Sequence, residues 1–569
     1  MTEIVFQYQG REIAAREGES LAAALTQAGV RAFRETAKGA ERGIFCGMGV
    51  CQDCLVDVDG TPNRRACMTP VENGMSVTRQ VALPEFGHEV KTPDGEALHL
   101  SPNVLVVGGG AAGLSAAITA AEAGAEVVLL DERKVAGGQY YKQAANGTIL
   151  DQQQDDGAQL VARAKASGAR LISGVELWGA FDGLLFLGHR EGAPLIAKPK
   201  TAIIATGAYE RPVTVPGWTL PGVMTTGAAQ TLWRSYQTLP GKRIAVCGSG
   251  PLNVQVALEL AKGGAEIVYL AERAPAAITK PLTALAMAAA DPKLTLQGLN
   301  MLAGLRQHGI KVRNNSELRK VVQDGDGLAA TFTASGGEET VHVDVLCMNA
   351  GFEPQNEILR LLGASMQYDA AMGHLRCEKN TRMETSVSGL YAIGDCTGLG
   401  GAPAARIEGE IAGANAAAAT GHGEPGDLSG KRRTLAKHRK FQTKLWTLYD
   451  ITQRDTAPLP DETTICRCEE LTLGDVRTGL ATTPGHVGSL KRATRVGMGR
   501  CQGRYCGPIA ARMVSDATGK AIEDLSFFAP RVPIKPVAIS AILAAEEAIG
   551  EVQGESLVEA VIEAPDDSG

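Results

Sequence analysis

One unit of sequence occurs twice in this chain, and it restricts the possible folds more than any other feature. Residues 108–133 (GGGAAGLSAAITAAEAGAEVVLLDER) align without a gap on residues 248–273 (GSGPLNVQVALELAKGGAEIVYLAER). Each copy follows a short apolar run and consists of a glycine-rich turn, an Ala-rich helix and a second buried strand. The pattern strand, helix, parallel strand is a βαβ unit, so the repeat predicts two related dinucleotide-type domains in an α/β protein.

The first copy has every feature that dinucleotide binding needs. Gly108, Gly110 and Gly113 form a G-x-G-x-x-G motif between a predicted strand and a predicted helix. The first glycine permits a tight turn, the second lets the backbone approach a pyrophosphate, and the third lets helix and strand pack closely. The N-terminus of the helix adds positive potential toward the phosphates. Asp131 ends the second strand, where a carboxylate binds the adenosine ribose, so this copy predicts a bound dinucleotide.

The second copy departs from the motif at two positions. Asn253 stands where the third glycine is needed, and Ala271 stands opposite Asp131 in the alignment. Asparagine disfavours close packing, and alanine cannot hydrogen-bond a ribose. Glu272, one residue further on, is a carboxylate that could replace the lost acid. We therefore expect a retained fold without its ligand, and use of NAD(P)H stays open as the alternative.

From about residue 103 to 420 the chain resembles the glutathione-reductase-type flavoproteins, which have two dinucleotide domains. The resemblance rests on Gly137-Gly138-Gln139, Ala205-Thr206-Gly207 and Gly394-Asp395, in that order. It implies FAD at the first site, with Asp395 on the ribityl chain. It also implies a helix starting near Ala404 whose dipole stabilises reduced flavin. The implied FAD-binding residues are Gly108, Gly110, Ala112, Gly113, Asp131, Glu132, Gly138, Gln139, Val175, Ala205, Thr206, Gly207, Gly394, Asp395 and Ala404.

Composition and charge limit the kind of protein. The net charge is −7 without a basic domain, which argues against a nucleic-acid partner. The first residues do not form a secretory signal, and no apolar run reaches the roughly 18 residues that span a bilayer. We expect a cytoplasmic protein that meets a membrane only through its partners. In that reducing compartment the 12 cysteines are not a disulfide framework, and eight of them fall into two groups.

The first group is Cys46-x4-Cys51-x2-Cys54-x12-Cys67. It begins with the spacing of plant-type ferredoxins, and two glycines in its first loop let the backbone wrap a cluster. The short gap before the last cysteine is similar to that of the iron–sulfur subunit of succinate dehydrogenase. Zinc is the competing metal, but zinc modules usually show two short Cys-x2-Cys knuckles. The spacing favours a 2Fe–2S cluster.

The second group is Cys466-x-Cys468-x32-Cys501-x4-Cys506. It resembles the 2Fe–2S domain of bacterioferritin-associated ferredoxin, although the last gap in that family is usually two residues. Related flavoprotein subunits carry the wider gap in runs like GMGRCQGRYCGP, and some have a further cysteine where this chain has Val496. The resemblance implies a second 2Fe–2S cluster, with a zinc ribbon or free thiols as the alternatives.

The order of these parts resembles the α-type subunit of heteromeric amine dehydrogenases, a group that includes opine oxidases, D-hydroxyproline dehydrogenase and hydrogen cyanide synthase. The run ATGAYERPVTVPGWTLPGVMTTGAAQ at 205–230 is a specific match. The resemblance implies an electron relay. A separate β subunit of the D-amino-acid-oxidase type would oxidise a C–N bond, and electrons would enter through an interface FMN. They would leave to a quinone or a carrier protein.

Two other functions remain open: a stand-alone NAD(P)H-dependent iron–sulfur flavoprotein reductase and a non-catalytic redox-sensing or assembly protein. Catalytic residues cannot be named from this sequence. The expected fold is an α/β two-dinucleotide-domain flavoprotein with an N-terminal ferredoxin-like α+β domain and a small C-terminal α domain. The expected parts are a ferredoxin-like domain (1–85), a linker (86–101), an FAD domain (102–235 and 345–422), an NAD-like domain (236–344), a linker helix (423–459), a Cys-x-Cys domain (460–535) and a C-terminal tail (536–569). We expect the acidic end of this tail to be frayed.

Overall fold

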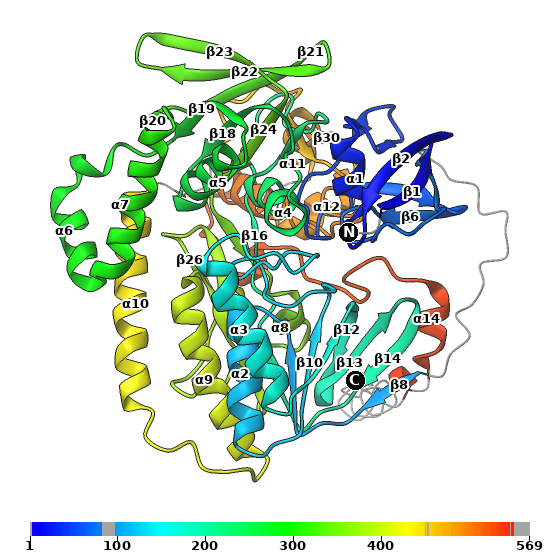
Figure 1. Ribbon diagram of the computed structural model, residues 1–569, viewed down its shortest axis with the longest axis vertical. Coiled ribbons are helices and arrows are strands. Elements are labelled where there is room, and N and C mark those ends of the chain that lie inside the picture. The colour runs from blue at the N-terminus through cyan, green and yellow to red at the C-terminus, as the bar shows by residue number, and fades with distance from the viewer. Residues whose placement is uncertain are drawn as a thin grey trace, which may run out of the picture.

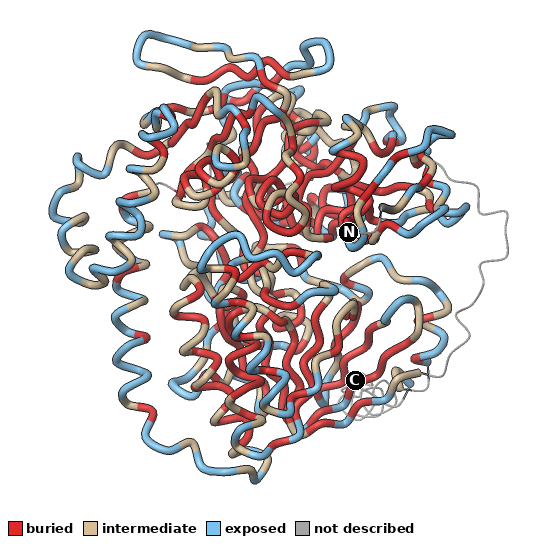
Figure 2. Tube along the Cα trace, in the orientation of Figure 1, coloured by how far each residue is buried: buried red, intermediate tan, exposed pale blue. Residues whose placement is uncertain are grey.

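The computed structural model of the chain describes residues 3–81, 97–449, 451, 455–483, 485–546 and 548–550. The expected fold class is confirmed. Two five-stranded parallel sheets, each with helices packed on it, form the centre of the molecule (Figure 1). The N-terminal ferredoxin-like domain and the C-terminal domain lie against the second of these units (Figure 1). Most strands of the two parallel sheets are buried (Figure 2).

The N-terminal domain is a mixed sheet with one short helix. Its elements are β1 (Glu3–Tyr8), β2 (Arg11–Arg16), α1 (Leu21–Gln27), β3 (Arg34–Glu35), β4 (Glu41–Arg42), β5 (Leu55–Val58), β6 (Thr61–Arg65) and β7 (Ser76–Arg79). The strand order is β2-β1-β7-β5-β6, with β3 and β4 paired separately. Helix α1 begins where the Ser20 hydroxyl accepts a hydrogen bond from the Ala23 N–H, and its alanines and leucines are buried in the core.

The first dinucleotide unit has the parallel order β11-β10-β9-β15-β28. Its elements are β9 (Val104–Val107), α2 (Ala111–Glu122), β10 (Val127–Asp131), α3 (Gln152–Ala166), β11 (Arg170–Ser173), β15 (Thr201–Ile204), β28 (Leu390–Ala392) and α9 (Gly401–Ala419). Helices α2 and α9 touch through small residues, because a Cβ on Gly409 would lie 2.2 Å from the Ala112 carbonyl oxygen. The Ala/Gly-rich sequence of α9 is thus required by close helix packing.

A second sheet, β12-β13-β14-β8, belongs to the same unit. It contains β8 (Leu98–Leu100), β12 (Val175–Phe181), β13 (Leu185–Arg190) and β14 (Ala193–Ala197). The expected linker therefore ends early, since Leu98–Leu100 pair with β14. Residues 82–96 of that linker lie outside the described residues.

The second dinucleotide unit repeats the first around the sheet β17-β24-β18-β19-β20. Its elements are β17 (Val223–Thr225), α4 (Thr226–Tyr236), β18 (Arg243–Gly248), α5 (Pro251–Lys262), β19 (Glu266–Glu272), α6 (Pro281–Ala290), α7 (Pro292–Gln307), β20 (Val312–Asn314), β21 (Leu318–Asp324), β22 (Gly327–Ala334), β23 (Gly337–Val343) and β24 (Val345–Asn349). Short strands β16 (Ala208–Glu210) and β25 (Phe352–Pro354), which pair with each other, connect the two units.

The remaining chain joins the units together. Its main elements are α8 (Glu357–Leu361), β26 (Met366–Asp369), β27 (His374–Cys377), α10 (Ser429–Leu448), β29 (Thr464–Cys466), β30 (Leu471–Thr472), α11 (Leu473–Thr482), α12 (Val487–Thr494), α13 (Gly507–Thr518) and α14 (Ile539–Leu543). Among the described residues, none of the helices combines the length and apolarity that a membrane crossing would need.

The first part of the C-terminal tail is packed against the first dinucleotide unit. Val537, Ile542 and Ala545 pack with Trp178 in a small hydrophobic core on the β12–β14 sheet. Burial of these apolar side chains outweighs the ordering cost of the segment. The residues from 551 onward lie outside the described part of the chain.

Candidate functional site

A cavity of about 490 Å³ lies between the two dinucleotide units. The glycine loop after β9, the end of β10 and the first turn of α9 form one part of its wall. Residues of α5, α7 and α10 form another part. The carboxyl ends of parallel strands and helix N-termini therefore face this space, which is the usual position of a dinucleotide in such sheets.

The glycine loop of the first unit has no room for side chains. Gly108 has φ of +108°, and a Cβ on it would lie 2.4 Å from the Ala205 carbonyl oxygen. A Cβ on Gly113 would lie 1.8 Å from the Gly108 carbonyl oxygen. The loop is thus a backbone cradle at the N-terminus of α2, as a pyrophosphate requires.

Asp131 lies buried at the cavity wall. Its carboxylate accepts hydrogen bonds from the Gly109 N–H at 2.5 Å and the Arg133 N–H at 2.7 Å. Burial raises the pKa of Asp131, and the two N–H donors oppose that effect. The bonds fix the carboxylate beside the glycine loop, where a ribose hydroxyl would meet it.

Asp395 is held at the start of α9. It accepts hydrogen bonds from the Gly400 and Gly401 N–H groups at 2.9 and 3.0 Å. Burial raises the pKa of Asp395, again against these donors. The helix begins at Gly401, earlier than the expected start near Ala404, so its N-terminus and Asp395 reach the cavity together.

Sequence reasoning missed a charged network beneath Asp395. Glu408 of α9 accepts a hydrogen bond from the Gly394 N–H at 2.8 Å and pairs with Lys379 at 2.8 Å. It also pairs with Arg439 of α10 at 2.7 Å. Burial raises the pKa of Glu408, but these two cations hold it below its ordinary value. A charged residue inside an Ala- and Gly-rich helix was the signal available.

The structure gathers almost all of the residues predicted to bind FAD around the cavity. The two exceptions are Gly113, which packs beneath the loop, and Ala404, which is buried within α9. Residues not predicted also line the wall, among them Glu357 and Lys535. A cradle that any Cβ would fill, together with two carboxylates held by backbone N–H groups, fits FAD.

The first cysteine loop forms part of the same cavity wall. Cys46, Met48 and Val50 all line the cavity. Arg133 donates a hydrogen bond to the Gly47 carbonyl at 3.1 Å. A group bound by this loop would therefore lie beside whatever the cavity holds.

The cysteines of this loop lie in pairs. Cys46 is hydrogen-bonded to Cys51, and Cys54 to Cys67. The Met48 and Cys51 N–H groups also donate to the Cys46 sulfur at 3.5 and 3.4 Å. Burial acts to raise the pKa of Cys46, but these hydrogen bonds lower it to about 7. A buried sulfur that receives several hydrogen bonds has the character of a cluster ligand.

The second cysteine group is paired in the same way. The Cys466 and Cys506 sulfurs are 3.8 Å apart, and Cys468 is hydrogen-bonded to Cys501. The Cys506 hydrogen bond lowers the pKa of Cys466 to about 7 against the effect of burial. Val496 is fully buried in the core of this small domain.

Nowhere in the described part of the chain do three Cys, His, Asp or Glu side chains gather closely enough to hold one metal ion. Thiols arranged two by two suit a binuclear cluster, in which each iron takes two thiolates.

The two cysteine groups come together in space, although the flavin-type domains separate them in the sequence. Cys46, Cys51 and Cys501 belong to one hydrophobic core, and Cys468 packs against it. The two cysteine groups are therefore neighbours in the structure, although about 400 residues separate them in the sequence.

The second glycine loop keeps its turn but differs in its surroundings. A bulge at β19 puts Ile244 opposite Ile267 and Ala245 opposite Tyr269. This shifts the following residues by one position, so Glu272, not Ala271, is the counterpart of Asp131. Glu272 accepts hydrogen bonds from the Gly250 and Ala274 N–H groups at 3.0 and 2.8 Å.

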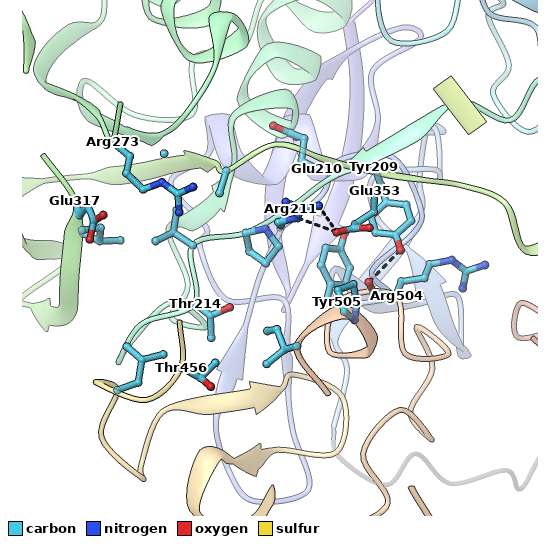
Figure 3. A pocket seen from close by; sticks show the side chains of 18 of the residues that line it. Tyr209, Glu210, Arg211, Thr214, Arg273, Glu317, Glu353, Thr456, Arg504 and Tyr505 are labelled. Atoms are coloured by element: carbon cyan, nitrogen blue, oxygen red, sulfur yellow. Dashed lines mark hydrogen bonds and ion pairs between the residues drawn. The ribbon is translucent and has the colours of Figure 1, made fainter. Parts of the chain in front are cut away.

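Two side chains occupy the approach to this second loop. Asn253 is buried and bonds to Thr226 at 2.7 Å and to the Asn349 carbonyl at 3.0 Å. The Trp446 ring of α10 lies over Gly250, where a Cβ would be 3.4 Å from it. A separate cavity of about 70 Å³ also reaches the second glycine loop, at Gly248 (Figure 3). Its lining includes Arg211 and Glu353, which form a buried ion pair.

Comparison with known proteins agrees with this organisation. The family described as pyridine nucleotide-disulphide oxidoreductase matches residues 102–421. A 2Fe-2S iron-sulfur cluster binding domain matches residues 1–82, and the sarcosine oxidase A3 domain matches residues 462–547. The chain is thus a flavin-dependent oxidoreductase with FAD and an iron–sulfur cluster.

Individual relatives are components of larger enzymes. The A subunit of opine oxidase from Rhizobium meliloti is 31% identical over 390 residues, which cover 67% of this chain and 84% of that protein. Hydrogen cyanide synthase subunit HcnB of Pseudomonas aeruginosa is 31% identical over 60% of this chain and 75% of its own length. Subunit HcnA of the same organism is 43% identical over 75 residues, 13% of this chain and 72% of its own length.

Among solved structures, L-proline dehydrogenase from P. horikoshii is similar over nearly the whole chain. The TM-score is 0.71, with 20% sequence identity and coverage of 95% of this chain and 97% of that one. At that identity the similarity shows the fold alone.

Proposed function

The chain belongs to the pyridine nucleotide-disulphide oxidoreductase family and is homologous to the A subunits of opine oxidases. On that premise we propose that it is the electron-relay subunit of a heteromeric FAD-dependent amine or amino-acid dehydrogenase. The substrate class would be an opine, an imino acid or glycine. The substrate is oxidised at its CH–NH or CH–NH2 group by a separate β subunit of the D-amino-acid-oxidase type.

One observation carries this proposal: Cys46 lines the same cavity as the glycine loop and Asp395. FAD bound there accepts two electrons and can release them singly. The chain's own residues bind its phosphates, orient the ribityl chain through Asp395 and hold the first cluster against the cavity. The electrons would enter through FMN at the subunit interface and leave to a quinone or a carrier protein.

Exposed apolar side chains support the presence of a partner. Ile278, Leu282 and Leu285, on and just before α6, are 84%, 82% and 68% exposed, and Leu296 and Leu299 of α7 are also exposed. Apolar groups gathered in this way are typical of protein–protein interfaces.

Two measurements on purified protein, with and without a co-purified partner, test the proposal. The isolated chain should contain one FAD and about four irons with equal acid-labile sulfide, because two 2Fe–2S clusters are proposed. It should be reduced by an opine, imino acid or glycine only when the β subunit is added. Two zinc ions per chain, or substrate oxidation by the isolated chain, would contradict it.

A second function has one observation in its favour. Glu272 occupies the acid position of the second glycine loop, as an NAD(P)H-dependent reductase requires. Asn253 and Trp446 act against it, since they fill the space that a pyrophosphate and the close helix packing need. Rapid mixing with NADH separates the two functions.

A further inference from the structure

A buried ion pair joins the two cysteine loops. Asp53 directly precedes Cys54, and Arg467 lies between Cys466 and Cys468. The Arg467 Nε atom donates a hydrogen bond to Asp53 Oδ2 at 2.7 Å, and their side chains are only 4% and 1% exposed. The pair therefore spans the boundary between the N-terminal and C-terminal domains, and each of its partners is next to a cysteine of its own group.

Aromatic rings complete this contact. The Arg467 guanidinium carbon lies 3.8 Å from the centre of the Phe45 ring and 4.7 Å from that of Trp218. Phe45 directly precedes Cys46. Its ring also contacts the Tyr505 ring, with centres 5.5 Å apart, and Tyr505 directly precedes Cys506. Figure 3 shows Tyr505 beside Tyr209 and Arg504. Residues adjacent to both sets of thiols thus touch one another.

The domain boundary has a second polar contact at Glu470, two residues after Cys468. Glu470 accepts a hydrogen bond from the Thr36 hydroxyl at 2.7 Å and from the Lys38 N–H at 3.2 Å. It holds the same two domains together nearer the surface. The boundary therefore does not need the Asp53–Arg467 pair for adhesion alone, and an ion pair that is fully buried adds little stability over apolar packing.

We propose that Phe45, Asp53 and Arg467 form the contact through which single electrons pass between the two clusters, with Arg467 as a positioning residue. This inference rests on the proposed function, since it needs both clusters. One cluster loses one electron and the other gains it, with no bond formed or broken and no proton transferred. The electrons come from the FAD, whose two electrons leave in two such steps.

The sign of the electrostatic effect follows from the charge of Arg467. A reduced cluster carries one more negative charge than an oxidised one, so a buried cation beside it favours reduction. Removal of that cation leaves the Asp53 carboxylate paired with Arg34 at 2.9 Å and with Arg42 as the other nearby cation. Both clusters should then become harder to reduce.

Electron paramagnetic resonance of the fully reduced full-length protein tests the contact without any substitution. The two paramagnetic clusters should broaden or split each other's signals. Iron content is measured first: two irons per chain would contradict the second cluster and with it the proposed function. Four irons with two independent signals would overturn only this inference.

Variants then test the role of Arg467. In Arg467→Met the iron and FAD content should be unchanged. The equilibrium constant for one-electron reduction of the clusters should fall at least tenfold, which is about 59 mV. Arg467→Lys, which keeps the charge but loses the planar stacking, should recover the potential and not the full magnetic interaction. Glu470→Gln, which weakens the other contact between the two domains, is the control for the contact and should leave the magnetic interaction unchanged. Wild-type potentials and signals in Arg467→Met would overturn the assignment, and if that variant loses its iron, the Arg467→Lys spectrum decides.

Discussion

At the scale of single residues, buried charges connect segments that are far apart in the sequence. Glu132 follows Asp131 at the cavity wall and pairs with Arg65 of the N-terminal domain at 3.0 Å and with Lys535 of the C-terminal segment. Arg65 also donates to the Gly49 carbonyl of the first cysteine loop at 2.8 Å. Burial acts to raise the pKa of Glu132, but Lys535 and Arg65 lower it to about 2.

Substitution Glu132→Gln should lower the stability of the folded protein in a pH-dependent way. The folded pKa of about 2 is below the ordinary value of 4.5, so the ionised carboxylate stabilises the fold above about pH 4.5. That contribution is lost as the pH falls toward 2. Breaking such a pair costs about 3 kcal/mol. Melting temperatures of both proteins should differ at pH 7 and converge on acidification; an equal difference at every pH would contradict the account.

Gly113→Ala should prevent retention of FAD. Its new Cβ would lie 1.8 Å from the Gly108 carbonyl oxygen, so the glycine loop must move out of its binding conformation. Flavin absorbance after gel filtration measures the loss, which should be nearly complete. Gly430→Ala in α10 is the control, because nothing lies within 4 Å of its Cβ and alanine favours a helix. Full flavin content in Gly113→Ala would show that the loop is not the site.

At the scale of elements, one irregular strand changes how the second dinucleotide unit is read. The gap-free alignment puts Ala271 at the position of the ribose-binding acid. The bulge in β19 shifts the strand by one residue, so Glu272 occupies that position in the structure. Helix α10 then places Trp446 over Gly250. The second unit therefore retains an acid at the end of β19, but a side chain of α10 occupies the space next to its glycine loop.

NADH should therefore reduce the flavin slowly. With micromolar NADH, stopped-flow absorbance should show no full bleaching within a second, because Trp446 and Asn253 occupy the approach and the packing space. Dithionite, which needs no site, is the control and should bleach it fully. Rapid reduction by NADH would favour the reductase function instead.

What the sequence could predict follows from how local each feature is. The glycine turn at Gly108 and the spacing from Cys46 to Cys54 depend on neighbouring residues, so the fold class could be predicted. The Asp53–Arg467 pair joins residues 414 positions apart, so no local sequence pattern could predict it. The position of Glu272 depends on a bulge, which a gap-free alignment cannot contain.

At the scale of the whole molecule, the chain brings together parts that its sequence keeps apart. The first cysteine loop lies between the cavity and the second cysteine group, since Cys46 lines the cavity and shares a core with Cys501. The chain also unites regions that match two separate subunits of hydrogen cyanide synthase. Here both regions belong to one chain, and the first cysteine loop forms part of the cavity wall.

Under the proposed function, substrate oxidation and electron exit take place in different subunits, and Cys501→Ser should reveal the separation. The substitution replaces a soft thiolate of the second group by a hydroxyl and should weaken or remove that cluster. In the complex with the β subunit, turnover with an artificial acceptor should fall at least tenfold. Reduction of the partner's flavin in a single turnover should stay fast, because that step precedes the clusters. Cys347→Ser, at a buried cysteine outside both groups, is the control for a general effect of losing a thiol. Loss of the first reductive step in a Cys501→Ser complex that still assembles would mean that the second group serves substrate oxidation itself, and the relay would be wrong.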